Sequence, residues 1–118
     1  MELACTQEDG HILAACEGQL DETSNQAFRN SLHPLFSEPG VNVVVDISNV
    51  SRINSQGISA MVRLVADANT QGCRVIFAGP SPFVHEVLKV TRLDGYFEVT
   101  SSKAEAIESL RSDVRQSG

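Results

Sequence analysis

Basic residues are scarce in this sequence, and their scarcity excludes one kind of binding surface. Lysine and arginine together number 9 against 15 aspartates and glutamates, which gives a formal net charge of −6 at pH 7. Surfaces that follow the phosphates of nucleic acids or the head groups of anionic membranes need clustered positive charge. No stretch of the sequence provides such a cluster. We therefore expect no direct contact with nucleic acid.

Long apolar runs and closely paired cysteines are also missing. No run approaches the roughly 20 apolar residues that cross a bilayer, and Met1–Ala4 carries an acid instead of the basic lead of an export signal. We expect no membrane insertion and a cytoplasmic location. Cys5, Cys16 and Cys73 lie too far apart for a zinc site or a dense disulfide framework, so we expect reduced, buried thiols.

The remaining composition is sufficient for one ordinary core. The chain has 118 residues, of which 42% are hydrophobic and 20% are charged, although it has no tryptophan and one tyrosine. This length is close to the commonest domain size, and this balance is typical of folded proteins. We predict a single domain over residues 1–112, followed by a polar tail over residues 113–118.

The first half of the sequence predicts a hairpin followed by a helix. The apolar-rich segments Leu3–Glu8 and His11–Glu17 flank Asp9-Gly10, a dipeptide that favours a tight turn because both residues tolerate positive φ. Apolar residues then recur at helical spacing over Thr23–Phe36. Pro34 lies inside this segment and costs a backbone hydrogen bond. The helix is therefore expected to bend or to finish in a tighter last turn.

The second half alternates strands with helices. The β-branched run Val41–Ile47 predicts a well-buried central strand, and we expect Asp46 and Ser48 at its end to shape the turn that precedes the next helix. This alternation implies an α/β fold with a mixed sheet and at least one parallel, right-handed crossover. The further expected elements are a helix over Gln56–Gln71, a strand over Arg74–Ala78, a short helix from Pro82, a strand over Tyr96–Val99 and a helix over Ser102–Arg115.

Several of these segments, taken in order, resemble the STAS domain. They are VVVDIS at Val43–Ser48, INSQGI at Ile53–Ile58, SPFV at Ser81–Val84 and LDGYF at Leu93–Phe97. The resemblance covers nearly the whole chain. It implies a single α/β domain with a mixed central sheet of about five strands and four helices mainly on one face. STAS domains include bacterial anti-sigma factor antagonists.

The resemblance also implies a partner and a switch. In the antagonists, an anti-sigma factor serine kinase of the histidine-kinase-like ATPase class phosphorylates a serine, and only the unphosphorylated form binds that kinase and releases its sigma factor. The antagonist motif reads aspartate, target serine, serine or threonine, glycine and an apolar residue. The corresponding positions here are Asn54, Ser55, Gln56, Gly57 and Ile58. Ser55 therefore falls on the phosphorylation position, which predicts an antagonist that regulates transcription indirectly.

A serine at the start of a helix is suited to such a switch on physical grounds. The first backbone N–H groups of a helix have no partners within it, so a hydroxyl can cap them and a phosphate would be stabilised by them. Phosphorylation adds about −1.5 to −2 charges at neutral pH. Serine is also one of the commonest N-caps, so a purely structural role for Ser55 is the alternative.

We predict that the partner-binding surface surrounds this turn. The resemblance places Asp21 in a loop near the same surface, with helix capping as an equally good interpretation. Ser59 and Arg63 lie four residues apart on the expected helix and are better surface candidates than Met61 and Val62, which belong to its core stripe. The predicted partner-binding residues are Asp21, Asn54, Ser55, Gln56, Gly57, Ser59 and Arg63.

Nothing in the sequence indicates catalysis, a metal site or a cofactor. His11, His33 and His85 lie in different elements without ligand spacing, and Ser55 has no recognisable base or nucleophile turn. We therefore expect no enzyme. Asn54 and Gln56 depart from the antagonist motif, which leaves a second interpretation: a STAS module that is not phosphorylated and acts as a transporter or scaffold subunit or binds a small ligand.

Overall fold

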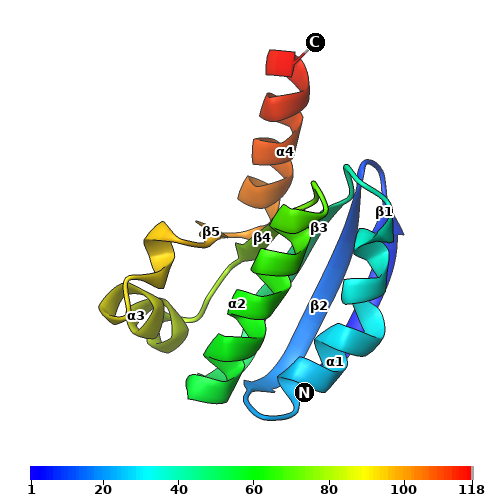
Figure 1. The fold of residues 1–118 in the computed structure, drawn as a ribbon. Coiled ribbons are helices and arrows are strands. Elements are labelled where there is room, and N and C mark those ends of the chain that lie inside the picture. Colours follow the sequence, from blue (N-terminus) through cyan, green and yellow to red (C-terminus); the bar gives the residue numbers. More distant parts are fainter. Residues whose placement is uncertain (118) are drawn as a thin grey trace.

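The computed structural model describes the backbone of residues 1–117 and the side chains of residues 1–111. Within that part, five strands and four α-helices follow one another along the chain (Figure 1). Short 3₁₀ helices follow α1 and α3. The strands are β1 Glu2–Glu8, β2 His11–Leu20, β3 Asn42–Ile53, β4 Arg74–Ala78 and β5 Glu98–Thr100; the helices are α1 Ser24–Ser31, α2 Ser55–Thr70, α3 Pro82–Val90 and α4 Lys103–Ser117.

The strands form one mixed sheet in the order β1-β2-β3-β4-β5. β1 and β2 are an antiparallel hairpin that turns at Asp9-Gly10, and the other neighbouring strands are parallel. The helices α1, α2 and α3 each connect two parallel neighbours. The predicted α/β fold with a mixed sheet is confirmed.

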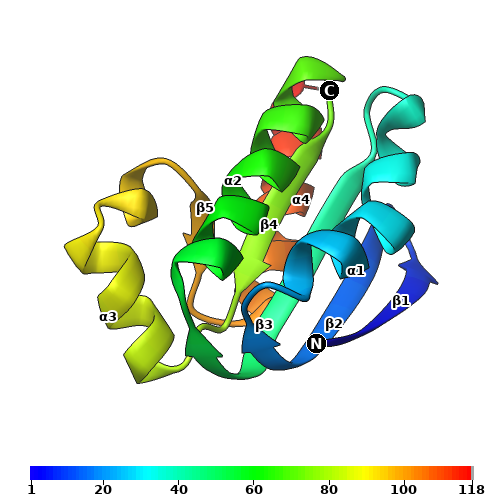
Figure 2. The same ribbon diagram turned by 60° about the horizontal axis from the view of Figure 1, so that its bottom comes forward.

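The helices cover the two faces of the sheet unequally (Figures 1 and 2). Successive side chains of a strand point to opposite faces, so Val43 and Val45 of β3 face one side and Val44 faces the other. The helices α1, α2 and α3 pack in the larger core with Val43 and Val45. On the opposite face, Leu110 of α4 packs in a smaller core with Val44 and Ile76. Three of the four helices therefore lie on one face, as predicted.

Two central strands are longer than the sequence predicted, because each supports the other. β2 continues to Leu20 instead of ending at Glu17, and β3 continues to Ile53 instead of ending at Ile47. Residues 17–20 pair with residues 49–53 in parallel, with irregular register, beyond the point where β4 ends. Pairing with a neighbouring strand overrides the weak strand propensity of the polar residues there. This extended pairing of β2 with β3 places Leu20 opposite Ile53.

The expectation that Asp46 and Ser48 shape the turn before α2 is wrong. Asp46 lies inside β3, opposite Ala78, and its Oδ1 accepts a hydrogen bond of 3.0 Å from the backbone N–H of Ser48. Asn54 follows Asp46 by eight positions along extended chain, which corresponds to roughly 26 Å. Both polar residues therefore lie near the C-terminal end of β4, away from the turn.

The other element boundaries follow local geometry. The tighter last turn expected at Pro34 is confirmed, since α1 ends at Ser31 and a 3₁₀ helix spans His33–Ser37. The final strand begins at Glu98 instead of Tyr96, because the N–H groups of Tyr96 and Phe97 both donate to the Leu93 carbonyl and close another 3₁₀ turn.

The predicted polar tail, residues 113–118, overlaps the last turns of α4. Its side chains lie outside the described residues, as does all of residue 118. The domain boundary at residue 112 stays a prediction.

Candidate functional site

The turn from β3 into α2 is closed by Asn54. Its Oδ1 accepts hydrogen bonds of 3.0 Å from the backbone N–H groups of both Gln56 and Gly57, which makes Asn54 the N-cap of α2. An asparagine caps a helix about as well as an aspartate or a serine. The interpretation of Ser55 as the cap is therefore wrong, and Ser55 is the first residue of the helix.

Ser55 is exposed, and its hydroxyl holds no other group of the described residues in place. Among the described residues the Ser55 hydroxyl has no hydrogen-bond partner, although the Ser55 carbonyl accepts a bond of 3.1 Å from the Ser59 hydroxyl. The neighbouring Gln56 is exposed as well. An exposed hydroxyl on a capped helix start is accessible to a modifying enzyme and held by a rigid backbone.

Gly57 is needed for a close approach between two segments of backbone. A Cβ on Gly57 would come far inside van der Waals contact with the carbonyl group of Leu20 and lie 2.9 Å from the backbone nitrogen of Asp21. The same carbonyl of Leu20 accepts a hydrogen bond of 3.0 Å from the N–H of Asn54. The start of α2 is thus locked against the end of β2, and only glycine fits there.

Asp21 shapes the loop that follows β2. Its Oδ1 accepts hydrogen bonds from the Thr23 hydroxyl, at 2.6 Å, and from the Thr23 N–H, at 2.9 Å. These hydrogen bonds lower the pKa of Asp21 from its usual value, the bond from the Thr23 hydroxyl more than the bond from the Thr23 N–H. The backbone N–H of Asp21 donates to the hydroxyl of Ser24, the buried first residue of α1. Asp21 therefore stabilises the turn that leads into α1 and does not cap the helix itself.

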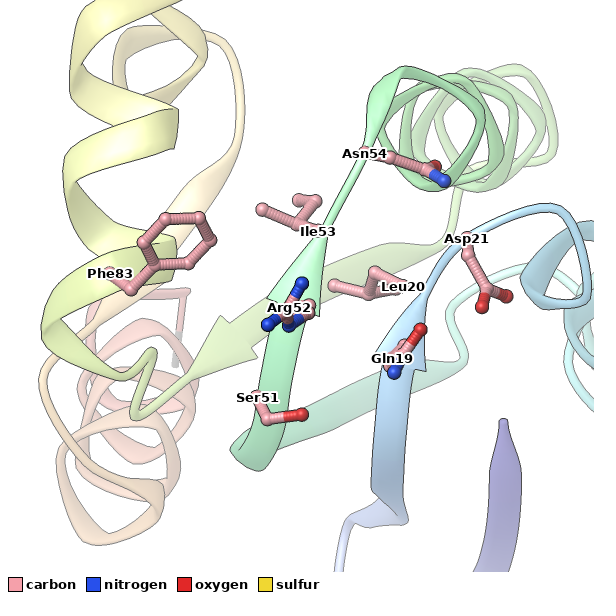
Figure 3. A pocket seen from close by; sticks show the side chains of 8 residues that line it. All are labelled: Gln19, Leu20, Asp21, Ser51, Arg52, Ile53, Asn54 and Phe83. Carbon is pink, nitrogen blue, oxygen red and sulfur yellow. The ribbon is translucent and has the colours of Figure 1, made fainter.

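Asp21 and Asn54 both line an open depression of about 570 Å³ (Figure 3). The depression lies at the C-terminal ends of β2 and β3, and Phe83 from the first turn of α3 lines it as well. In Figure 3 the Phe83 ring projects from α3 and faces the ends of β2 and β3. The lining residues are Gln19, Leu20, Asp21, Ser51, Arg52, Ile53, Asn54 and Phe83.

The predicted partner-binding residues fall into two groups, of which only one lies at this depression. Asp21 and Asn54 line it, and residues 55–57 follow directly in the chain. Ser59 and Arg63 are exposed further along α2 and do not line it. Met61 is buried and Val62 partly buried against the core, as their stripe predicted.

Sequence reasoning missed Phe83 and Arg52. Arg52 was outside every predicted element, because the extension of β3 was not foreseen. Phe83 follows Pro82 and lies off the stripe that Val84 and Leu88 place in the core. A large aromatic residue outside the core-facing stripe of an amphipathic helix was the signal that could have revealed it.

The described residues contain no group of three or more histidines, cysteines, aspartates and glutamates that could hold a metal ion. In the part described, no helix has the length and apolar character to cross a bilayer. The Nδ1 atom of His33 lies 2.7 Å from a carboxylate oxygen of Asp67. This contact joins the 3₁₀ helix that follows α1 to helix α2.

Comparison with known proteins gives one family and one fold. The STAS domain family model matches residues 2–106. An anti-sigma-factor antagonist (STAS) domain protein from Planctomyces limnophilus superposes with a TM-score of 0.80 at 21% identity, over 92% of this chain and 97% of that chain.

Two further solved structures share the fold. The anti-sigma factor antagonist SpoIIAA in its unphosphorylated form is 16% identical, with a TM-score of 0.70 over 93% of this chain and 98% of that one. A murine anion transporter of the Solute Carrier 26 family is 16% identical, with a TM-score of 0.75 over 91% of this chain but 18% of the transporter. At these identities the likeness concerns the fold.

Proposed function

Because this chain belongs to the STAS domain family, we propose that it is an anti-sigma factor antagonist, a protein that binds an anti-sigma factor serine kinase and is switched off by phosphorylation of Ser55. It acts on transcription indirectly, through its partner, and it is not itself an enzyme. The observation that carries the proposal is the exposed, unengaged hydroxyl of Ser55 on the capped start of α2.

Phosphorylation at this position changes binding and leaves the fold intact. The hydroxyl of Ser55 has no hydrogen-bond partner among the described residues, so its modification removes no hydrogen bond within that part of the chain. Asn54 already occupies the N–H groups of Gln56 and Gly57. A phosphate is therefore left largely to solvent, although the helix dipole favours it. When a partner closes over the turn, about −1.5 to −2 charges must be desolvated or paired.

The departure of Asn54 from the antagonist motif leaves the structural part of the motif intact. Its side-chain oxygen makes the two capping bonds that an aspartate would make. Its Nδ2 in turn donates a long hydrogen bond of 3.4 Å to Glu22. The turn therefore keeps its shape with a neutral residue at position 54, and a carboxylate is still present beside it.

The proposal is tested with purified histidine-kinase-like serine kinases from the same genome. Each kinase is mixed with this protein and ATP, phosphate is located by mass spectrometry, and binding is measured for wild type, Ser55→Ala and Ser55→Asp. We expect phosphate on Ser55 and an affinity at least about 100-fold lower for Ser55→Asp, because an unpaired buried charge costs about 3–5 kcal/mol.

A matched control separates position from charge. Ser37 is also exposed and lies in the 3₁₀ helix at the opposite end of β3, so Ser37→Asp adds the same charge away from the turn and should bind like wild type. If no kinase of this class modifies Ser55 and Ser55→Asp binds every one of them as wild type does, the proposed switch is wrong.

A second candidate function is a STAS module that is not phosphorylated. Gln56 and Asn54 depart from the antagonist motif, and the fold also occurs inside an anion transporter. As a transporter or scaffold subunit, or as a small-ligand binder, the protein would act constitutively. Equal binding of wild type and Ser55→Asp to a transport protein encoded beside it would favour this candidate.

A further inference from the structure

The outer side of α3 carries an apolar stripe that nothing in the described structure covers. Phe83 is 56% exposed and Val90 is 72% exposed, and both rank among the exposed large hydrophobic residues of the described chain. Val87 lies between them and is partly exposed. Spacings of four and three residues place all three on one face of the helix. We call Phe83, Val87 and Val90 the α3 stripe.

The α3 stripe is continuous with the surface around Ser55. Phe83, Val87 and Val90 line a groove of about 210 Å³ along α3. Phe83 also lines the depression that Asp21 and Asn54 line (Figure 3). One side chain thus joins the apolar groove to the polar turn, and a molecule that covers the turn and fills the depression contacts Phe83.

The polar turn alone is too small and too polar for a stable interface. A stable complex buries about 800 Å² on each partner, with aromatic residues enriched at its centre and polar residues at its rim. Ser55, Gln56 and Ser59 offer only polar groups. The aromatic residue available in the same depression is Phe83. The α3 stripe supplies the apolar area that the turn lacks.

We infer that the α3 stripe is the apolar half of the surface that binds the anti-sigma factor kinase, with Phe83 as its anchor. This inference rests on the proposed function, because the occupant is the same partner. The kinase lies across both elements: it contacts the Ser55 turn at the start of α2 and buries the Phe83 ring and the Val90 side chain against α3. Phosphorylation then acts at one edge of an interface whose affinity comes largely from the other.

The test measures the affinity of the unphosphorylated protein for the kinase that binds wild type. We expect Phe83→Ala to weaken binding at least about tenfold, as truncation of a central aromatic anchor does, and Phe83→Ala with Val90→Ser to weaken it further. His85→Ala is the matched control. His85 is exposed on the same helix but lines a different groove, with Val99 and Ser101, so it should bind within about twofold of wild type.

The outcomes separate the inference from the proposed function. If wild type binds no kinase of this class, both are wrong. If wild type binds and Phe83→Ala binds equally well, the inference alone is wrong. Since Phe83 and Val90 are exposed, their variants should keep the thermal stability of wild type, which circular dichroism checks. A dimer of this chain alone that Phe83→Ala dissociates would assign the stripe to a second copy and overturn the inference.

Discussion

Replacement of Gly57 by alanine tests how α2 is held against β2. The added methyl group would overlap the carbonyl of Leu20 and lie 2.9 Å from the nitrogen of Asp21. Both obstacles are backbone atoms at the end of a paired strand, so neither can swing aside as a flexible side chain would. Relief requires the start of α2 to move away from Leu20, which strains the 3.0 Å hydrogen bond from Asn54.

The magnitude follows from three contributions. Overpacking a tight site costs about 1–3 kcal/mol, occasionally more, and loss of the bond to Leu20 adds about 0.5–1.5 kcal/mol. The higher helix propensity of alanine returns up to about 1 kcal/mol. We expect the free energy of unfolding to fall by about 2–3 kcal/mol, which corresponds to a melting temperature lower by roughly 10 °C for a domain of this size.

Urea denaturation followed by circular dichroism measures this change, with Gly95→Ala as the control. Gly95 lies in the 3₁₀ helix after α3, has no positive φ, and has no atom within 4 Å of a Cβ built on it. Its replacement should change the free energy of unfolding by less than about 0.5 kcal/mol. A Gly57→Ala protein as stable as the Gly95→Ala protein would refute the close-approach argument.

Three further predictions concern the cap and two titrating groups. Asn54→Ala should lower the free energy of unfolding by about 1 kcal/mol through loss of the cap, whereas Asn54→Asp should stay near wild type; urea titration of both variants checks this. The pKa of Asp21 is lowered by the Thr23 hydrogen bonds, so its contribution is present above the unfolded pKa of about 3.9 and is lost as the pH falls through the lower folded pKa. Carbon NMR should find the Asp21 midpoint below 3.9 and a higher one in Thr23→Val. Burial, as the main cause, raises the pKa of the Cys16 thiol to about 12. Cys5 is exposed, which corrects the expectation that all three cysteines are buried. Iodoacetamide at pH 8 should therefore label Cys5 before Cys16 in the native protein, and equal rates by mass spectrometry would contradict this.

Local patterns in the sequence were enough for the fold class and for the helix start that carries Ser55. The Asp9-Gly10 turn, the β-branched run that became β3 and the helical stripe of α2 each carry their own signal, because each depends on neighbouring residues alone. The motif around Ser55 lies at the start of a helix, where the sequence placed it, for the same reason. Pro34 even predicted the 3₁₀ end of the first helical segment.

The exact shape of the site depended on residues that are distant in the sequence. The extension of β3 to Ile53 needs β2 as a partner, and no periodicity within residues 48–53 predicts it. Because that extension was not foreseen, Asp46 and Ser48 were predicted to lie near the turn. In the structure they lie inside β3, several residues before the turn. The choice of Asn54 over Ser55 as the cap was equally open, since both residue types cap helices well.

The sequence by itself therefore determined the order of strands and helices, the family resemblance and the exposed serine turn, since these follow from periodicity, turn residues and a short motif. Two features were decided by the tertiary structure alone. Gly57 must be glycine because the backbone of Leu20 in β2 approaches it closely. The apolar side chain that lines the depression beside the turn is Phe83, which comes from α3. Both features depend on how segments distant in the sequence pack together, and local sequence patterns do not predict the distances between such segments.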